Sequence, residues 1–438
     1  MKPLLAFVFS LFLAAPALAE IDIQTVETPK GFTAWLVEEP SIPFTSLEIR
    51  FEGGTSLDAP GERGATHLMV ALLEEGAGEY DARGFAEASE ALAASFRYDS
   101  GPDTVSVSAK FLTENRDAAM ALLRESLVAP RFDEDAVERV RAQVLSSIRS
   151  DAKDPDAIAN ATFDRMLFGD HPYGSQPEGT EESVSALSRD DLIAAHKAAL
   201  ARDRVYIAAA GDISAEELSS LIDGLLGDLP ATGAPLPADL EVTTTAGVTV
   251  VPFDTPQSVA MFGQKGLKRD DPDFFAAYVM NTILGGGGFE ARLMTEVREK
   301  RGLTYGVYSY LVPLDHAELY LGRVASANDR VAEAITVIRD EWAKMARDGV
   351  TREELDQAKT YLTGAYPLRF DGNGPIARIL VGMQMDGLTP DYVTTRNAQV
   401  EAVTLEDVKR VAGDLLKPDA LRFVVVGQPE GLEETPGQ

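Results

Sequence analysis

The chain has 438 residues, enough for two or three domains, and its 45% hydrophobic and 25% charged residues are ordinary for a globular protein. Seventy Asp and Glu residues outweigh 40 Lys and Arg residues, and the resulting net charge of −30 repels nucleic-acid phosphates and anionic lipid surfaces. The absence of cysteine excludes a disulfide framework, a thiol nucleophile and a lipid-modified cysteine.

The first 19 residues have the pattern of a secretory signal peptide. Lys2 precedes an apolar run from Leu4 to Ala15, and Ala17-Leu18-Ala19 is a small-x-small cleavage site. The run is shorter than the roughly 20 residues that a membrane-spanning helix needs, and no later segment approaches that length. We therefore expect cleavage after Ala19, a mature chain that starts at Glu20, and a periplasmic or secreted protein without membrane insertion.

Strands and helices alternate along the first half. Hydrophobic and polar residues alternate over 47–52 and again over 105–111, which is the period of two expected of strands with one buried face. The segment 64–76 between them reads as a buried helix, and 115–128 as an amphipathic helix.

The end of the first half and the end of the chain share one pattern. A helix that begins at Ser188 and a strand over 205–210 are followed, 216 residues later, by a helix that begins at Thr404 and a strand over 422–426. A glycine follows each strand. Because both elements recur at one offset, the sequence predicts two copies of one fold.

The duplication predicts two tandem homologous domains. We place the first at 20–228, an exposed linker rich in Pro and small residues at 229–247, and the second at 248–438. Strands with one polar face, mixed with several helices, favour an α+β fold. Each domain is expected to hold a mixed, mainly antiparallel sheet packed with helices.

Several motifs resemble the pitrilysin/insulinase family of zinc peptidases, the inverzincins. In the first half they are the strand end 53–58, the helix 64–76 and the stretch Gly169-Asp170-His171-Pro172-Tyr173-Gly174. In the second half they are the four glycines Gly285, Gly286, Gly287 and Gly288 and the stretch from Val297 to Tyr305. The resemblance covers essentially the whole mature chain and implies half of a peptidase clamshell.

The family's metal motif is H-x-x-E-H on the first helix, with two His ligands, a Glu general base and a distant Glu ligand. Only His67 remains here, because Val70 and Ala71 replace the base and the second His. Val140 stands where the distant ligand is expected, with Glu138 as the alternative. We therefore expect no metal in this chain. The remaining histidines, expected on the surface or in structural hydrogen bonds, are His171, His196 and His316.

A second group of residues carries the expected substrate site. Residues 289–300 read as a helix that ends before Gly302, and 305–311 as a strand. The resemblance implies that Arg298 and Tyr305 match an Arg/Tyr pair that faces the zinc site across a chamber and binds the substrate backbone. A guanidinium and a phenol can each donate to a peptide carbonyl. The alternative is an Arg paired with a nearby Glu and a Tyr packed at the strand start. The glycine run is either a substrate-contacting loop or a plain turn.

Some members of this family assemble two half-length chains, of which one lacks the metal motif. The sequence therefore predicts the non-catalytic subunit of a heterodimeric exported zinc peptidase, with no catalytic residue and no cofactor of its own. Zinc is expected in a half-length partner that carries H-x-x-E-H, and the substrate is a peptide. Two alternatives stay open: a self-sufficient zinc peptidase with unconventional ligands, and a peptide-binding or scaffold protein without a proteolytic role.

Overall fold

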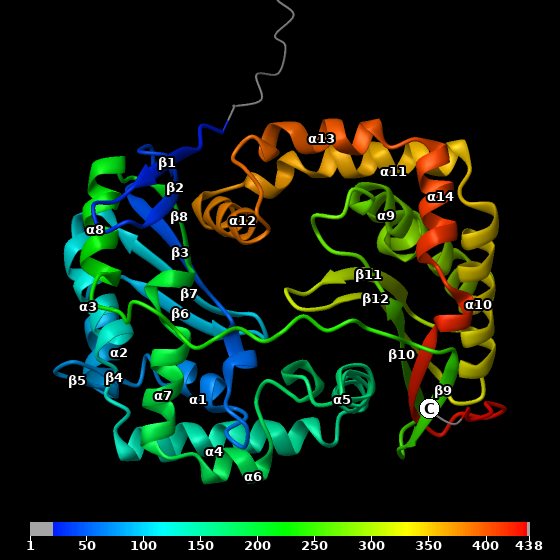
Figure 1. Cartoon of the computed structure of the whole chain (residues 1–438), viewed down its shortest axis with the longest axis horizontal. Coiled ribbons are helices and arrows are strands. Elements are labelled where there is room, and N and C mark those ends of the chain that lie inside the picture. Colours follow the sequence, from blue (N-terminus) through cyan, green and yellow to red (C-terminus); the bar gives the residue numbers. More distant parts are fainter. Residues whose placement is uncertain (1–20, 436–438) are drawn as a thin grey trace, which may run out of the picture.

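The computed structural model describes residues 21–435, so the predicted signal peptide at 1–19 lies outside the described residues. Figure 1 shows two units side by side, each a twisted sheet with helices around it. This arrangement confirms the predicted α+β class with a sheet and helices in each half.

The first half is built on a six-stranded sheet. Its strands are β1 (Gln24–Glu27), β2 (Thr33–Glu38), β3 (Phe44–Glu52), β6 (Ser95–Ser100), β7 (Thr104–Leu112) and β8 (Val205–Gly211). Their order is β1-β2-β8-β3-β7-β6, and only β2 and β8 run parallel. A small hairpin, β4 (Gly76–Ala77) and β5 (Tyr80–Asp81), stands apart from it.

The second half repeats this plan with five strands. They are β9 (Gly247–Pro252), β10 (Gln257–Lys265), β11 (Val307–Pro313), β12 (Glu318–Ala327) and β13 (Arg422–Gly427). Their order is β11-β12-β10-β13-β9, and only β13 and β9 run parallel. Read from the other edge, this order matches β2-β8-β3-β7-β6, with the parallel pair in the same place.

Fourteen named helices surround the two sheets within the described part of the chain. Those of the first half are α1 (Ala65–Ala71), α2 (Ala82–Ala91), α3 (Arg116–Val128), α4 (Glu134–Asp151), α5 (Pro155–Phe168), α6 (Glu181–Ala186), α7 (Arg189–Ala199) and α8 (Ala215–Leu226). Those of the second half are α9 (Phe274–Asn281), α10 (Val331–Asp348), α11 (Arg352–Ala365), α12 (Asn373–Met385), α13 (Tyr392–Ala402) and α14 (Leu405–Leu415).

Matching capping boxes mark the repeat. Ser188 caps α7, where its hydroxyl accepts from the backbone N–H of Asp191 and the Asp191 carboxylate accepts from the backbone N–H of Ser188. Thr404 and Asp407 form the same reciprocal pair at α14. Each box satisfies two backbone N–H groups that the helix start would otherwise leave unpaired, so both starts are encoded locally.

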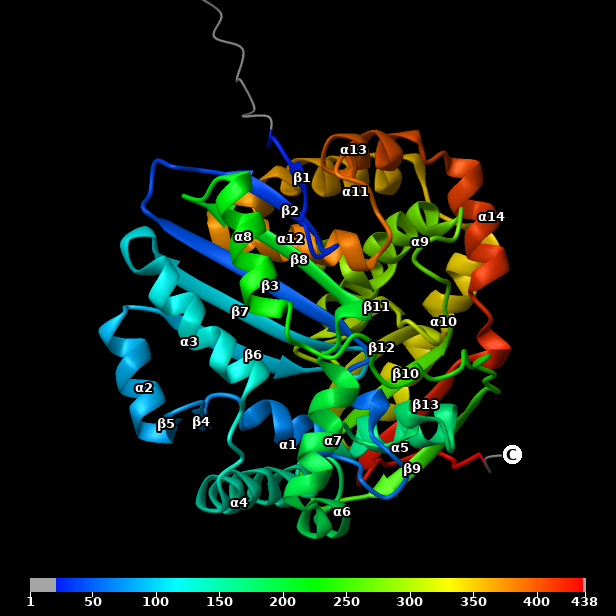
Figure 2. The same cartoon turned by 60° about the vertical axis from the view of Figure 1, so that its left-hand side comes forward.

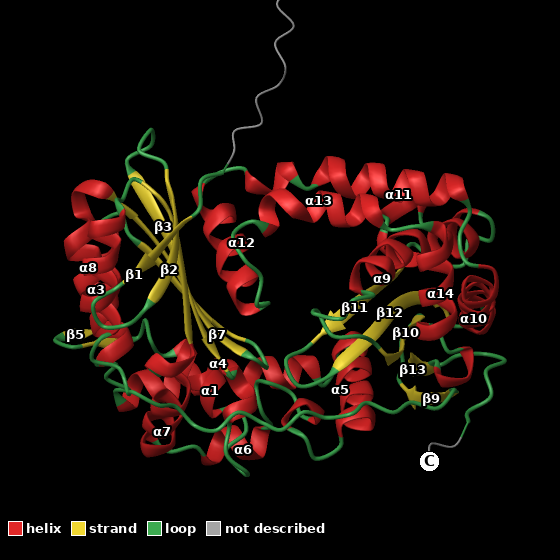
Figure 3. Cartoon of the chain, turned by 45° about the horizontal axis from the view of Figure 1, so that its top comes forward, coloured by secondary structure: helices red, strands yellow, loops and turns green. Residues whose placement is uncertain are grey.

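Each half lends one helix to the sheet of the other half. Figure 3 shows the first sheet between α3 and α8 on one side and α12, from the second half, on the other. Leu380 and Val381 of α12 pack on Trp35 and Ala208 of the first sheet. In return α5 packs on β10 and β13, where Phe163 is fully buried. These exchanged surfaces join the halves, since each buried large side chain contributes about 1.5–3 kcal/mol.

The sequence predicts one solvent-exposed face for β3, but a helix of the second half covers that face. Leu47 and Ile49 face α3 and α8, which cover the outer face of the sheet in Figure 2, and both are 1% exposed. The opposite face was predicted to be solvated. Glu48 lies on it and is only 2% exposed because α12 covers that face.

Residues 227–246 contain neither helix nor strand and run from α8 to β9. No helix in the described part of the chain is both long enough and apolar enough to cross a membrane.

Candidate functional site

His67 is the one histidine of the degenerate metal motif, and it lies half-buried on α1. Its Nδ1 is 3.0 Å from the hydroxyl of Ser100, the last residue of the edge strand β6. The predicted helix over 64–76 is too long, because α1 ends at Ala71. Gly76 has φ +122°, which lies outside the right-handed helical region, and the chain turns there into the β4–β5 hairpin.

The donors around His67 do not fit a zinc ion. Val70, at the base position, and Val140, at the distant ligand position, are each 3% exposed and belong to the hydrophobic core. Ala71 replaces the second His, so none of these positions carries an oxygen or nitrogen donor. The Glu138 side chain is 66% exposed, and its carboxylate pairs with Arg141 at 3.3 Å. One imidazole is left where four-coordinate zinc needs at least three protein ligands.

The other histidines have structural partners. His196 is buried, and its Nε2 is 2.8 Å from the carbonyl oxygen of Leu127. His171 Nε2 is 3.1 Å from the Ala238 carbonyl oxygen, and His316 lies beside the Asp239 carboxylate. Across residues 21–435, no three His, Asp or Glu side chains lie close enough together to share one metal ion.

The glycine run begins inside one π-helical segment, Thr282–Gly286, and a second segment, Met294–Glu299, follows it. Such segments are rare and are frequently found at functional sites. Gly285 is buried against β11, where an added Cβ would lie 2.4 Å from the hydroxyl oxygen of Ser309. Glycine at this position is therefore required for the close approach of the run to the strand.

A hollow of about 490 Å³ lies between the glycine run and β11. Gly285, Gly286 and Gly288 line it, whereas Gly287 faces a separate, smaller hollow beside α11. At its base the buried hydroxyl of Ser309 donates to the side-chain oxygen of Asn281 at 2.8 Å. The wall also includes Tyr308 and Tyr310 of β11, which are 45% and 37% exposed.

The predicted helix over 289–300 is interrupted. A 3-10 turn spans Gly288–Glu290, and the π-helical segment starts only at Met294. The backbone N–H of Lys300 bonds to the carbonyl of Thr295, five residues back, at 3.0 Å, which is the spacing of a π-helix. Arg298 lies in this segment and is half-buried.

The predicted strand over 305–311 starts two residues too early, because β11 begins at Val307. The hydroxyl of Thr304 donates to the carbonyl of Ala325 at 2.6 Å and accepts from the N–H of Gly306 at 3.0 Å. These bonds hold the chain in a turn at 304–306. Tyr305 lies in that turn and is 87% exposed, so its ring does not pack at a strand start.

Asp164 is a carboxyl that acts on Tyr310 of β11 and that the sequence did not indicate. It lies on α5 of the first half, and burial raises the pKa of its carboxyl to about 7, although a hydrogen bond from Gln176 lowers it in part. Burial first, then the charges of Tyr308 and Asp164, raise the pKa of Tyr310. The exchanged helix α5 therefore brings a carboxyl of the first half close to the tyrosines of β11.

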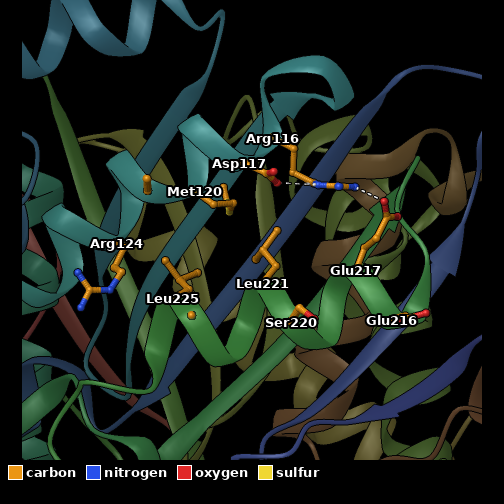
Figure 4. Close-up of a pocket in the computed structure, with 11 residues that line it drawn as sticks. Arg116, Asp117, Met120, Arg124, Glu216, Glu217, Ser220, Leu221 and Leu225 are labelled. Carbon is orange, nitrogen blue, oxygen red and sulfur yellow. Dashed lines mark hydrogen bonds and ion pairs between the residues drawn. The ribbon is translucent and has the colours of Figure 1, made fainter.

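A second hollow, about 500 Å³, lies between α3 and α8 (Figure 4). Arg116 bonds to Glu217 there at 2.9 Å, as the dashed line shows. Its floor is formed by Met120, Leu221 and Leu225. None of the predicted site residues lines it.

Comparisons with known proteins agree with this geometry. Residues 34–181 match the family described as "Insulinase (Peptidase family M16)", and residues 186–362 match "Peptidase M16 inactive domain". A non-peptidase homolog named YmxG, from Helicobacter pylori, is 27% identical over 418 residues, which cover 94% of this chain and 95% of that protein. An uncharacterized zinc protease of Streptomyces coelicolor is 27% identical, with 90% of this chain and 87% of that protein covered.

Solved structures give the same result. The crystal structure of a peptidase M16 inactive domain from Pseudomonas fluorescens has a TM-score of 0.88 and 30% identity, and covers 95% of this chain and 100% of that one. A protease from Helicobacter pylori has a TM-score of 0.84 at 17% identity, and covers 93% of this chain, which shows the shared fold. The chain therefore belongs to peptidase family M16, the insulinase family, and is a non-catalytic member of it.

Proposed function

We propose that this chain is the substrate-binding subunit of an exported zinc peptidase, and that a half-length homologue with an intact H-x-x-E-H motif holds the zinc. One contrast carries the proposal. The base position and the distant ligand position have become packed apolar side chains, Val70 and Val140, whereas Tyr305 is held on the surface by a hydrogen-bonded turn. A chain that needed only its fold would gain little from keeping an exposed phenol there.

The surface around this turn suits an extended peptide. β11 is an edge strand, with no sheet partner on its outer side among residues 21–435. An edge strand offers backbone donors and acceptors to an added strand, and alternate side chains then enter neighbouring pockets. Tyr308 and Tyr310 flank the hollow on that strand, and Arg298 and Tyr305 would hold peptide carbonyls from the preceding segment.

The acidic surface supports a substrate preference. With a net charge of −30, the chain would attract Lys- and Arg-rich peptides and raise their rate of encounter. Cleavage of basic peptides by the assembled pair should slow as ionic strength rises, whereas cleavage of neutral peptides should change little.

A peptide-binding role without proteolysis is the second candidate, and the non-peptidase name of the Helicobacter pylori relative favours it. Co-purification from the native host separates the two. Recovery of a similar-sized chain with H-x-x-E-H supports the peptidase subunit, and repeated recovery of this chain without one supports the second candidate.

A reconstituted pair allows a sharper test. The double variant Arg298→Ala, Tyr305→Phe should lower kcat/KM for peptide cleavage by roughly tenfold or more, because two donors to the substrate are lost. The matched control is Arg352→Ala with Tyr361→Phe, both exposed on α11. If the complex with the Arg298→Ala, Tyr305→Phe variant cleaves peptides as fast as the complex with the natural chain, the proposed binding role is excluded.

A further inference from the structure

A third hollow lies in the second half, about 630 Å³ in volume, between α9, α12, α13 and the 3-10 turn Pro367–Phe370. None of its lining residues lines the hollow beside the glycine run. Its volume falls within the range of small-molecule sites, about 300–1,000 Å³.

The hollow is cationic in a strongly acidic chain. Four guanidinium groups line it, and the one carboxylate among its lining residues is that of Asp386. That carboxylate lies 3.4 Å from Arg269. Arg378 is 3.9 Å from Glu48 of the first sheet, which is a loose contact. Four guanidinium groups against two carboxylates, those of Asp386 and Glu48, leave an excess of positive charge that an anionic ligand would neutralise.

Two of the guanidinium groups lie over aromatic rings. The Arg269 guanidinium is 4.3 Å from the ring centre of Phe274, and it donates to the hydroxyl of Tyr392 at 2.9 Å. The Arg396 guanidinium lies 4.6 Å from the ring centre of Tyr366. Stacking of this kind fixes a guanidinium at low entropic cost. Arg396 Nη1 already donates to the Leu362 carbonyl oxygen at 2.7 Å and to the Asn397 side-chain oxygen at 2.9 Å, so its Nε and Nη2 groups are those that can reach a ligand.

One buried hydroxyl in the hollow has no partner. Tyr366 is 7% exposed, and its hydroxyl makes no hydrogen bond with any residue from 21 to 435. A buried hydroxyl without a partner reduces stability, so native structures rarely leave one. Burial raises the pKa of Tyr366 to about 12, and the hydroxyl therefore keeps its proton at neutral pH and can donate it.

We propose that this hollow binds a small aromatic carboxylate. The carboxylate would accept from the Tyr366 hydroxyl and from Arg369 and Arg396, and the ring would lie against the aromatic wall formed by Phe275 and Tyr392. An inorganic anion would neutralise the guanidinium groups, but it would leave the rings of the aromatic wall exposed to water. The same chemistry is offered by a free aromatic acid and by the C-terminal residue of a peptide that ends in Phe or Tyr.

The ligand would also support the helix that joins the two halves. All walls of the hollow belong to the second half, but Met383 lies on its α12 wall and in the cluster that packs on Trp35 and Ala208 of the first sheet. Binding should therefore raise the thermal unfolding midpoint of the whole chain, because only the folded state holds α12 beside α9 and α13.

Calorimetric titration of the full chain with N-acetyl-phenylalanine and with N-acetyl-phenylalanine amide tests the charge requirement, since the two probes differ only at the carboxylate. The acid should bind saturably and roughly tenfold or more tighter than the amide. Equal binding of acid and amide, no saturable binding, or equally tight binding of inorganic phosphate would each overturn the proposal. Phenylacetate and a peptide ending in Phe distinguish the sources: tighter binding of the peptide indicates a C-terminus, and equal binding a free acid.

Two variants test the residues. Tyr366→Phe removes only the unpartnered hydroxyl, so it should weaken binding of the acid by roughly fivefold or more while the unfolding midpoint of the free protein stays the same or rises. Arg369→Gln should also weaken binding, because it removes an exposed cation at the rim. Tyr361→Phe and Arg352→Gln, on exposed positions of α11, are the matched controls. Unchanged affinity in Tyr366→Phe would show that the hydroxyl has no part in binding and would overturn the assignment.

Discussion

The hydroxyl of Tyr173, in the first half, accepts a hydrogen bond from the backbone N–H of His316, in the second half, at 3.2 Å. The same hydroxyl donates to the carboxylate of Asp103. Asp103 also accepts from the backbone N–H of Asp315 at 3.2 Å. One buried phenol, in the 3-10 turn Pro172–Gly174 that closely follows the exchanged helix α5, thus joins the two halves.

Replacement of this phenol should loosen the junction. Tyr173→Phe removes both hydrogen bonds and leaves the 9% exposed Asp103 carboxylate without its hydroxyl donor. We expect the free energy of unfolding to fall by about 1–3 kcal/mol, measured by urea denaturation. The control is Tyr80→Phe at a 42% exposed position, which should change it by less than about 0.5 kcal/mol. Equal stabilities of the two variants would contradict the bridging role.

Asp164 predicts a pH dependence of stability. Its folded pKa of about 7 lies above the ordinary value of 3.8, so the folded chain keeps a proton that the unfolded chain releases. The contribution of this carboxyl to the free energy of unfolding is therefore most favourable below about pH 4, and it falls as the pH rises to about 7. Asp164→Asn should therefore be more stable than the natural chain by about 1–3 kcal/mol at about pH 8, with no gain at about pH 4. The exposed Asp170→Asn should show no such trend; a constant difference at all pH values would contradict the assignment.

Glu354 predicts the opposite trend. Burial raises its pKa, but hydrogen bonds from Arg292, at 2.6 and 2.7 Å, and from the N–H of Thr351 lower it to about 2 overall. Because this lies below the ordinary 4.5, the group stabilises the fold above about pH 4.5, and the contribution is lost as pH falls toward 2. Glu354→Gln should cost about 2 kcal/mol at pH 7 and less in acid. Glu353→Gln, at an exposed neighbour, is the control, and an equal loss in both variants would refute the pairing.

The close approach of Gly285 to β11 predicts that no larger side chain is tolerated at this position. Gly285→Ala would place a Cβ 2.4 Å from the Ser309 hydroxyl and 2.7 Å from its backbone nitrogen, so the run must move away from β11. We expect a loss of about 1–3 kcal/mol in unfolding free energy and weaker peptide binding. Gly364→Ala, inside α11 with no atom within 4 Å of the added Cβ, should instead be neutral or stabilising. A neutral Gly285→Ala would show that the close approach is not needed.

Local patterns predicted much of the fold. The alternation over 47–52 corresponds to β3, and the alternation over 105–111 lies within β7, because strand periodicity is a local property. Ser188 and Thr404 marked true helix starts, since a capping box lies entirely within four residues. The burial of Glu48 could not be predicted in this way, because the helix that covers it lies more than 300 residues later in the chain.

The site was harder to predict for two physical reasons. The π-helical segments at the start of the glycine run and after it have no composition that separates them from α-helix, so 289–300 read as one regular helix. The early start predicted for β11 missed the side-chain bonds of Thr304, which depend on the tertiary contact with Ala325. Asp164 acts on Tyr310 only because α5 packs on the second sheet, which no local pattern encodes.

The most direct measurement is peptide hydrolysis by the purified chain alone, with added zinc and with or without chelator. Because Val70 and Ala71 stand where a base and a ligand are needed, we predict no chelator-sensitive cleavage and no stoichiometric zinc, while a basic peptide still binds. Chelator-sensitive cleavage by the isolated chain, together with one zinc bound per chain, would contradict the account.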